Sequence, residues 1–205
     1  MVAIYILVAL VAYLIGSISF SVIFTKKLAG FDVREKGSKN AGSTNVLRTA
    51  GKKIAILTLV CDILKGLIAV LFAKIIGEMD HFDHIEYLVQ VAGIAVVLGH
   101  TFPIFFGFKG GKGVATSLGL LLLINWQIGL ICLVFALILI ISTRMVSLGS
   151  VSAAVLFPVL TMFITENYIV PGDYKIFGIL LGVFVCFNHR ANIKRLLKGQ
   201  ESKIF

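Results

Sequence analysis

The residues best suited to chemistry lie in a glycine-rich, doubly basic stretch, Gly107-Phe-Lys-Gly-Gly-Lys-Gly113. Its four glycines should expose backbone N–H groups and let a ligand approach closely, and its two lysines add cationic donors suited to phosphate. The spacing differs from that of an ATP-binding P-loop, because only three residues separate Gly107 from Gly111 and a glycine follows Lys112. The stretch predicts a phosphate-binding loop outside the ATPase class; a flexible turn at a membrane surface is the alternative.

Hydrogen-bonding side chains dominate a second stretch, Gly37-Ser-Lys-Asn-Ala-Gly-Ser-Thr-Asn-Val-Leu-Arg48. Ser43 or Thr44 is expected to cap a helix that runs on into the next apolar segment. Thr44 and Arg48, four residues apart, would then share one face of that helix. Free N–H groups at the start of such a helix favour an anion. The composition favours a binding segment over an ordinary hydrophilic loop.

A third polar stretch, Asn188-His-Arg-Ala-Asn-Ile-Lys-Arg-Leu196, follows the last apolar segment. His189 and Asn192 are three residues apart, so both side chains can face the interior of a helix bundle. The histidine is either part of a site or a structural residue whose hydrogen bonds are satisfied. The basic residues around it are expected to contact lipid headgroups.

Two charged residues, Asp62 and Lys65, stand inside an apolar segment and share one helix face. Each charge near the middle of a membrane costs roughly 2.5–3.5 kcal/mol on insertion scales, so such residues usually pair and often serve function. Two interpretations stay open. The pair either holds helices together, or Lys65 faces a substrate anion while Asp62 orients it.

Several familiar catalytic patterns are missing from the sequence. It contains no Gly-x-Ser-x-Gly nucleophile elbow, and no histidine is followed by an aspartate five positions later. An activated-serine or His–Asp mechanism is therefore not expected. His81 and His84 are weak evidence for a metal without further ligands, so we expect neither a metal nor a cofactor.

The elements that carry these residues are membrane helices. The chain has 205 residues, of which 59% are hydrophobic and 14% charged, whereas a soluble domain is about half apolar and about a quarter charged. This composition predicts an all-α polytopic membrane protein. The three cysteines lie in apolar runs and are expected to be free thiols.

The net charge of +9 is distributed by segment rather than spread evenly. Sixteen of the 19 Lys and Arg fall in 26–53, at Lys109 and Lys112, at Arg144, and in the 190–203 tail. Six of the ten acids fall in the segments between them, at 78–86 and at Glu166 and Asp173. The positive-inside rule places the basic segments in the cytoplasm and the acidic ones outside. The basic excess is thus a topology signal, and no nucleic-acid partner is expected.

Seven transmembrane helices follow from this pattern, with the N-terminus outside and the C-terminus cytoplasmic. One uncharged run, 114–143, would be about 45 Å long as a single helix, too long for a core of about 30 Å. Because both of its flanks favour the cytoplasm, it is expected to form two short helices that turn near Asn125. The spans are expected at 1–24, 54–76, 87–106, 114–143 as that pair, 146–164 and 176–187.

Taken together, the three polar stretches resemble the bacterial membrane glycerol-3-phosphate acyltransferases that use acyl-phosphate, the PlsY family. The longest match runs over Gly99-His-Thr-Phe-Pro-Ile-Phe-Phe-Gly-Phe-Lys-Gly-Gly-Lys-Gly-Val-Ala-Thr116, and Asp62-x-x-Lys65-Gly66 also fits. The resemblance spans nearly the whole chain in order. It implies one integral-membrane acyltransferase domain over residues 1–205.

The resemblance also implies the site residues. The catalytic set that it implies is Ser38, Asn40, Thr44, Arg48, Lys112, His189 and Asn192. The substrate-binding set is Asn45, Asp62, Lys65, Gly107, Lys109, Gly110, Gly111 and Gly113.

The implied reaction transfers a fatty acyl group from acyl-phosphate to the sn-1 hydroxyl of glycerol-3-phosphate, giving lysophosphatidic acid and phosphate. It is the first committed step of phospholipid synthesis. Membrane lipids and the soluble enzyme that makes acyl-phosphate are the further partners expected. The protein is expected in the bacterial inner membrane, with its active site facing the cytoplasm. A phosphate or organophosphate transporter is the alternative, and it would need polar residues along a path through both leaflets.

Overall fold

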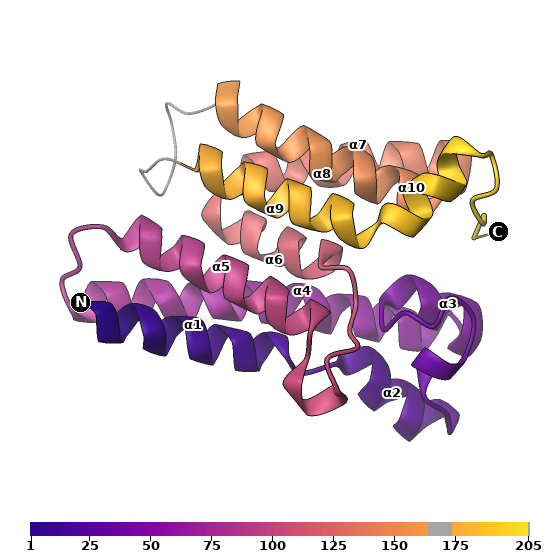
Figure 1. Ribbon diagram of the computed structural model, residues 1–205, viewed down its shortest axis with the longest axis horizontal. Helices are drawn as coiled ribbons and strands as arrows, with labels where there is room; N and C mark the ends of the chain where they lie inside the picture. Colours follow the sequence, from indigo (N-terminus) through magenta and orange to yellow (C-terminus); the bar gives the residue numbers. More distant parts are fainter. Residues whose placement is uncertain (164–173, 205) are drawn as a thin grey trace. The chain divides into compact units, whose positions relative to one another are not determined.

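The computed structural model describes residues 1–163 and 174–204, which form ten α-helices, two short 3₁₀ helices and no strand (Figure 1). The all-helical prediction is confirmed for these residues. The chain divides into two compact units, Met1–Leu123 and Ile124–Phe205, here called unit 1 and unit 2. The single acyltransferase domain over residues 1–205 stays a prediction.

Unit 1 consists of apolar helices, two shorter helices and two 3₁₀ helices of three residues each. Its elements are α1 (Val2–Gly16), α2 (Phe20–Ala29), η1 (Val33–Glu35), α3 (Ser43–Ala50), α4 (Lys52–Met79), α5 (Ile85–Thr101), η2 (Ile104–Phe106) and nearly all of α6 (Val114–Ile124). Helix α1 packs against α5 and α4, and α2 and α3 pack against α4 near its start.

Small residues let these helices approach closely. A Cβ on Gly16 of α1 would lie 2.2 Å from the carbonyl oxygen of Val96 in α5. A Cβ on Gly66 of α4 would lie 2.2 Å from the carbonyl oxygen of Thr116 in α6. Glycine is therefore required at both crossings, as in other membrane helix interfaces.

Unit 2 contains α7 (Trp126–Thr143), α8 (Val146–Phe163), α9 (Lys175–Asn188) and α10 (Arg190–Leu197). Asn125 begins α7, because its side-chain Oδ1 accepts a hydrogen bond of 3.0 Å from the N–H of Ile128. Helix α8 packs against both α7 and α9. The predicted helix break near Asn125 is confirmed, since α6 ends one residue before it and α7 starts one residue after it; that the chain reverses direction there stays a prediction.

Within the described residues, five helices are long and apolar enough to cross a membrane, and the bent pair α9–α10, counted as one span, raises the number to six. The two members of that pair meet at 67°. Helix α6 has 11 residues and would cover only about 16 Å, roughly half of the hydrocarbon core. The seven spans and their orientation therefore stay predictions. The end of the predicted span at residue 164, together with Glu166 and Asp173, lies outside the described residues.

The expected continuous helix from Ser43 or Thr44 into the second span is wrong. Gly42 occupies the N-cap of α3, so both hydroxyl residues fall in its first turn, and no side chain caps it. Helix α3 then ends at Ala50, because Gly51 adopts φ 86° and ψ 173°, a conformation that is almost restricted to glycine. The chain turns at Gly51 and α4 begins at the next residue.

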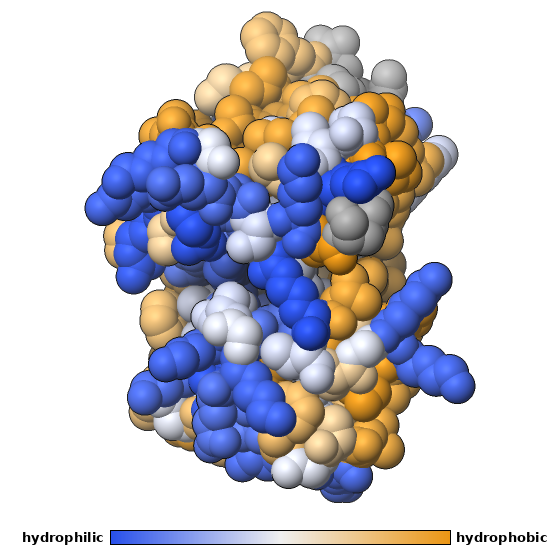
Figure 2. Space-filling model, turned by 90° about the vertical axis from the view of Figure 1, so that its right-hand side faces the viewer, coloured by the Kyte–Doolittle hydropathy of each residue, from blue (hydrophilic) through white to orange (hydrophobic). Residues whose placement is uncertain are grey.

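Hydrophilic side chains gather at the end of unit 1 that carries α2, α3 and the loops beside them (Figures 1 and 2). The exposed residues here include Lys26, Lys36, Ser38, Lys39 and Arg48. Exposed large apolar side chains lie along the longer helices instead, for example Leu59 and Ile68 on α4. This separation is expected of a bundle whose apolar sides face lipid.

Candidate active site

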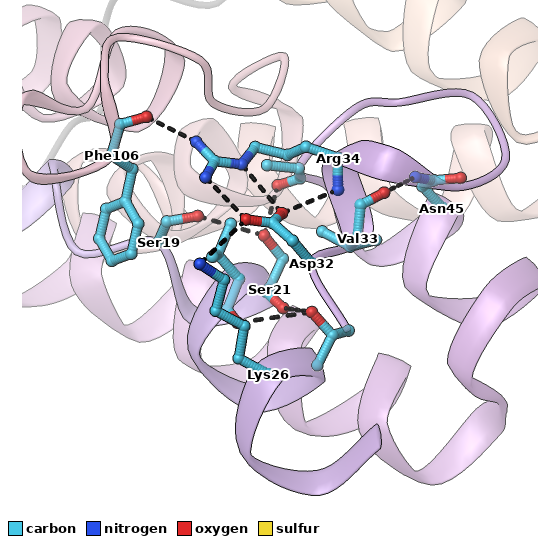
Figure 3. A network of polar contacts seen from close by, with 11 residues as sticks. Ser19, Ser21, Lys26, Asp32, Val33, Arg34, Asn45 and Phe106 are labelled. Carbon is cyan, nitrogen blue, oxygen red and sulfur yellow. Dashed lines mark hydrogen bonds and ion pairs between the residues drawn. The ribbon is translucent and has the colours of Figure 1, made fainter. Parts of the chain in front are cut away.

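The first polar loop of unit 1 is organised by Asn45, whose side chain is buried at 2% exposure (Figure 3). Its Oδ1 accepts a hydrogen bond of 2.9 Å from the N–H of Ser38. Its Nδ2 donates to the carbonyl oxygens of Val33, Lys36 and Asn40, each at 3.0 Å. One amide thereby engages both of its N–H donors, at least one of them shared between two carbonyls, and its oxygen with the segment that carries Ser38 and Asn40. The contacts give Asn45 a role in holding the loop; substrate binding by Asn45 stays a prediction.

An acidic residue that the sequence analysis did not single out, Asp32, ties this loop to the second one (Figure 3). Arg34 donates to both of its carboxylate oxygens, from Nε at 3.0 Å and from Nη2 at 2.8 Å, and Lys26 Nζ lies 3.2 Å away. The hydrogen bonds from Arg34 hold the pKa of Asp32 well below its usual range. The remaining guanidinium nitrogen, Nη1, donates to the carbonyl oxygen of Phe106, directly before the glycine-rich stretch.

The first and second polar stretches meet at Gly110. Its carbonyl oxygen accepts hydrogen bonds from the N–H of Ala41 and from the side-chain Nδ2 of Asn40, both at 3.3 Å. Ser21 Oγ in turn donates to the carbonyl oxygen of Ala41 at 2.9 Å. Unit 1 thus brings together the two segments that carry Ser38 and Lys112. Thr44 and Arg48 lie on the short helix α3, which begins within the first of these stretches, six residues after Gly37.

The glycine loop does not expose its N–H groups as expected at two positions. The N–H of Gly110 donates to the carbonyl oxygen of Thr101 at 3.1 Å, and the N–H of Gly111 donates to that of His100 at 3.0 Å. A Cβ at Gly110 would lie 2.0 Å from His100 O, and one at Gly111 would lie 2.1 Å from His100 Nε2. These glycines let the loop lie directly on the end of α5. A substrate role for Gly107, Lys109, Gly110, Gly111 and Gly113 stays a prediction.

Three buried hydroxyls lie at the end of α5 and in the first turn of α6. The carbonyl oxygen of Gly113 accepts the N–H of Ser117 at 2.8 Å, which closes the first turn of the helix. The hydroxyls of Thr101, Thr116 and Ser117 are buried, and no group in the described ranges hydrogen-bonds to them. Because buried hydroxyls are normally satisfied, and because helix N-termini favour anions, these groups beside Lys112 agree with a polar, anionic ligand.

The contacts of Asp62 and Lys65 agree with the structural interpretation. Lys65 Nζ lies 3.0 Å from Asp62 Oδ1 and donates at 3.0 Å to the carbonyl oxygens of Gly16 and Ile18, where α1 ends. His100 Nδ1 lies 3.5 Å from the same Asp62 oxygen. The pair joins α4 to α1 and α5 below 3% exposure on each residue. Direct contact of either residue with substrate stays a prediction.

In unit 2, His189 and Asn192 lie at the bend between α9 and α10, and both are buried. His189 Nδ1 lies 2.8 Å from the carbonyl oxygen of Val185, which can only accept, so Nδ1 carries the proton. Asn192 Nδ2 donates at 2.8 Å to Glu201 Oε1, and Arg195 Nε donates at 2.8 Å to Glu201 Oε2.

Glu201 was missed from the sequence because it is a single acid within a basic tail. Burial raises its pKa, but the hydrogen bonds from Arg195 and Asn192 outweigh that effect and lower it. The carboxylate is therefore charged at neutral pH and holds the tail against α10. The same carboxylate accepts the hydrogen bond from the side chain of Asn192, one of the residues predicted to be catalytic, and so fixes its orientation.

These features define an integral-membrane protein with helical spans and a buried ion pair. Two polar loops meet at Gly110, and their residue types suit the binding of an anion. Residues 6–199 match the family model described as glycerol-3-phosphate acyltransferase. The chain belongs to the glycerol-3-phosphate acyltransferase family.

Similar proteins agree over nearly the full length. A glycerol-3-phosphate acyltransferase of Clostridioides difficile (strain 630) is 45% identical over 200 residues, which are 98% of this chain and 95% of the relative. One from Nostoc sp. (strain PCC 7120 / SAG 25.82 / UTEX 2576) is 46% identical over 209 residues, covering 96% and 90%.

Two solved structures are similar as well. The glycerol 3-phosphate form of PlsY (YgiH), an integral membrane glycerol 3-phosphate acyltransferase, is 38% identical, with a TM-score of 0.84 and coverage of 97% of this chain and 94% of that one. Its lysophosphatidic acid form is 37% identical, with a TM-score of 0.82 and the same coverage.

Proposed function

We propose that this protein transfers a fatty acyl group from acyl-phosphate to the sn-1 hydroxyl of glycerol-3-phosphate. The family supports the acceptor, and the similar crystal structures are described as glycerol 3-phosphate and lysophosphatidic acid forms of their protein. The observation that carries the proposal is the junction of the two polar loops at Gly110, which sets Ser38 and Lys112 on neighbouring segments. The transporter alternative has no support among relatives that are named acyltransferases.

The proposed chemistry needs positioning more than a nucleophile. The sn-1 oxygen attacks the acyl carbonyl carbon, the bond between that carbon and the bridging phosphate oxygen breaks, and inorganic phosphate leaves. Acyl-phosphate is already activated, so catalysis consists of orientation and of stabilising the charge that develops on carbonyl and phosphate oxygens. Lys112, Arg48 and the start of α6 have the charge for that role, and Ser38, Asn40 and Thr44 supply hydrogen bonds.

The hydroxyl proton has two possible acceptors. One is a substrate phosphate, whose second pKa is about 6 by analogy with phosphoserine. The other is His189 in unit 2, with Asn192 beside it. We favour the substrate phosphate, because Nδ1 of His189 is engaged by a backbone carbonyl rather than by a carboxylate that would stabilise an imidazolium.

The proposed setting is the bacterial inner membrane, with the N-terminus outside and the polar end of unit 1 in the cytoplasm. The segregation of basic and acidic segments supports this orientation. A soluble enzyme would supply acyl-phosphate from the same side, and membrane lipid would take up the acylated product.

One experiment tests both the donor and the reaction. Purified protein in lipid is incubated with labelled glycerol-3-phosphate and either acyl-phosphate, acyl-coenzyme A or an acyl carrier protein thioester. We expect labelled lysophosphatidic acid when acyl-phosphate is the donor and none with either thioester. Equal product from a thioester would contradict the donor, and label accumulating unchanged inside sealed vesicles would indicate a transporter.

A further inference from the structure

His100, the penultimate residue of α5, lies between the buried ion pair and the glycine loop. Its Nδ1 is 3.5 Å from Asp62 Oδ1, and its carbonyl oxygen accepts the N–H of Gly111 at 3.0 Å. The other ring nitrogen, Nε2, packs directly against Gly111, because a Cβ added to this glycine would lie only 2.1 Å from Nε2. Only 7% of the residue is exposed. The imidazole thus contacts the Asp62 carboxylate through Nδ1 and faces the glycine loop with Nε2.

The carboxylate behind the ring is itself fixed. Lys65 Nζ contacts Asp62 Oδ1 and two carbonyl oxygens at the end of α1, all at 3.0 Å. These three acceptors match the three donors of an ammonium group. With an anion facing Nδ1, that nitrogen carries the ring proton and Nε2 is left as an acceptor toward the loop. Burying three ionisable groups in membrane helices is expensive, which indicates a role beyond filling space.

The two central glycines of the loop meet different parts of His100. A Cβ on Gly110 would lie 2.0 Å from His100 O, 2.7 Å from Pro103 Cδ and 2.8 Å from Thr101 O, and it would not meet the imidazole. The three atoms nearest to a Cβ on Gly111 all belong to the imidazole, namely Nε2 at 2.1 Å, Cε1 at 2.7 Å and Cδ2 at 3.1 Å. The ring therefore sets how closely Gly111 approaches α5, and the residue that follows Gly111 is Lys112.

We propose that His100 is a positioning residue of the acyltransferase: braced by Asp62 and Lys65, its imidazole places the Gly110–Gly113 segment so that Lys112 meets a substrate phosphate. This inference rests on the proposed function and deepens it. Nothing in the sequence pairs His100 with Asp62, because 38 positions separate them along the chain.

A kinetic experiment tests the role in phosphate binding. His100→Ala should raise KM for glycerol-3-phosphate by about tenfold or more, within the loss that a misplacement of about 1 Å can cause. Its kcat should change less, because the reacting groups are retained. His100→Gln, a neutral side chain that still fills part of the space, should show a smaller rise, and it carries the test where the alanine variant does not fold. His84→Ala, a substitution at an exposed residue, is the control and should leave KM and kcat unchanged.

A double-variant comparison tests the contact itself. Gly111→Ala should damage the wild type because its Cβ meets the ring, and it should do less damage in the His100→Ala background, where the ring is gone. Gly110→Ala should not be rescued in this way, because its Cβ meets the backbone of His100. The same comparison made on Tm without substrate reports the contact independently of activity.

The outcomes separate the inference from the function beneath it. Unchanged KM in both His100 variants at matched folded amounts, or independent effects of positions 100 and 111 on KM and Tm, would overturn the positioning role. Loss of kcat with unchanged KM, in variants where the effects of positions 100 and 111 are independent, would make His100 a proton-transfer group and would overturn it as well. An inactive wild type that still shows coupling between positions 100 and 111 in Tm would instead contradict the proposed reaction.

Discussion

The side chain of Asn45 holds the backbone of Ser38 in place, with 2.9 Å between Asn45 Oδ1 and Ser38 N. The same amide binds three carbonyl oxygens of the loop, so a single residue of α3 determines the course of the segment between η1 and α3. Ser38, a predicted catalytic residue, is exposed on that segment. Its position thus depends on a buried residue seven positions further along the chain.

We expect Asn45→Ala to lower stability by about 2–3 kcal/mol, because leaving buried hydrogen-bonding groups without partners costs about 1–3 kcal/mol. Asn45→Asp should be no better, since its carboxylate would face three carbonyl oxygens. Thermal unfolding in detergent measures the effect, with the exposed Lys39→Ala as control. A normal Tm combined with a raised KM would show instead that Asn45 contacts substrate.

Acid should weaken the junction made by Asp32. Its folded-state pKa is held down by Arg34, whereas an unfolded aspartate titrates at about 3.9. The stabilisation is therefore complete well above that pH and is lost as pH falls toward the lower folded value. Asp32→Asn should lower Tm at neutral pH and flatten the decline of Tm between about pH 5 and pH 3. Asp83→Asn removes an exposed carboxylate and should keep the wild-type slope; equal slopes in all three proteins would contradict the assignment.

Much of the helical layout could be predicted from local pattern. The break at Asn125 follows from an uncharged run too long for one span with flanks that favour the same side. The capping prediction was wrong because it relied on the hydroxyls of Ser43 and Thr44. Two glycines, Gly42 and Gly51, determine where α3 begins and ends. Hydropathy also cannot count spans when one helix, α6, is only 11 residues long.

The site shows the same division between local and distant information. Residue types indicated an anion-binding pair of loops, and unit 1 brings those loops together at Gly110. The contacts that hold the site in place could not be predicted from the sequence, because they join positions far apart along the chain: Arg34 to Phe106, and His100 to Asp62. The sequence predicts free N–H groups at Gly110 and Gly111, but close packing on α5 uses those groups within the protein.

Lys112 should contribute charge to a bound phosphate. Lys112→Ala is expected to lower kcat/KM by about 10²–10³-fold, the range seen when one electrostatic donor to a developing charge is removed. Lys198→Ala removes an exposed cation from the tail and should change kcat/KM little. Both variants are compared at matched folded amounts, with Lys112→Arg to test whether charge alone suffices. Normal kcat/KM in Lys112→Ala would remove the loop from the site.

The orientation in the membrane can be tested by cysteine accessibility in a background without Cys61, Cys132 and Cys186. Introduced cysteines at Lys52, Lys109, Arg144 and Lys198 should be protected from an impermeant reagent in intact cells, and one at Asp80 should be labelled. The physical basis is the concentration of Lys and Arg in the first set of segments. Labelling at position 109 with protection at position 80 would reverse the topology.

No covalent acyl-enzyme should form. Ser38 and Thr44 are the hydroxyl residues in the predicted catalytic set, and within unit 1 no histidine hydrogen-bonds to either of them, so neither is activated as a nucleophile. Rapid quenching after mixing with labelled acyl-phosphate alone should leave the protein unlabelled. A stoichiometric, hydroxylamine-sensitive acyl label on the chain would establish the opposite mechanism.

Direct transfer also predicts how far His189 matters. If the proton passes to a substrate phosphate, His189→Asn should keep a measurable fraction of kcat, because asparagine can still donate a hydrogen bond to the carbonyl of Val185 although it accepts no proton at neutral pH. Its Tm and KM should stay close to those of the wild type. The comparison is with Lys112→Ala, which removes charge from the phosphate. A loss of kcat as deep as in that variant, with substrate binding intact, would make His189 the general base, because only then would the reaction depend on the proton affinity of its ring.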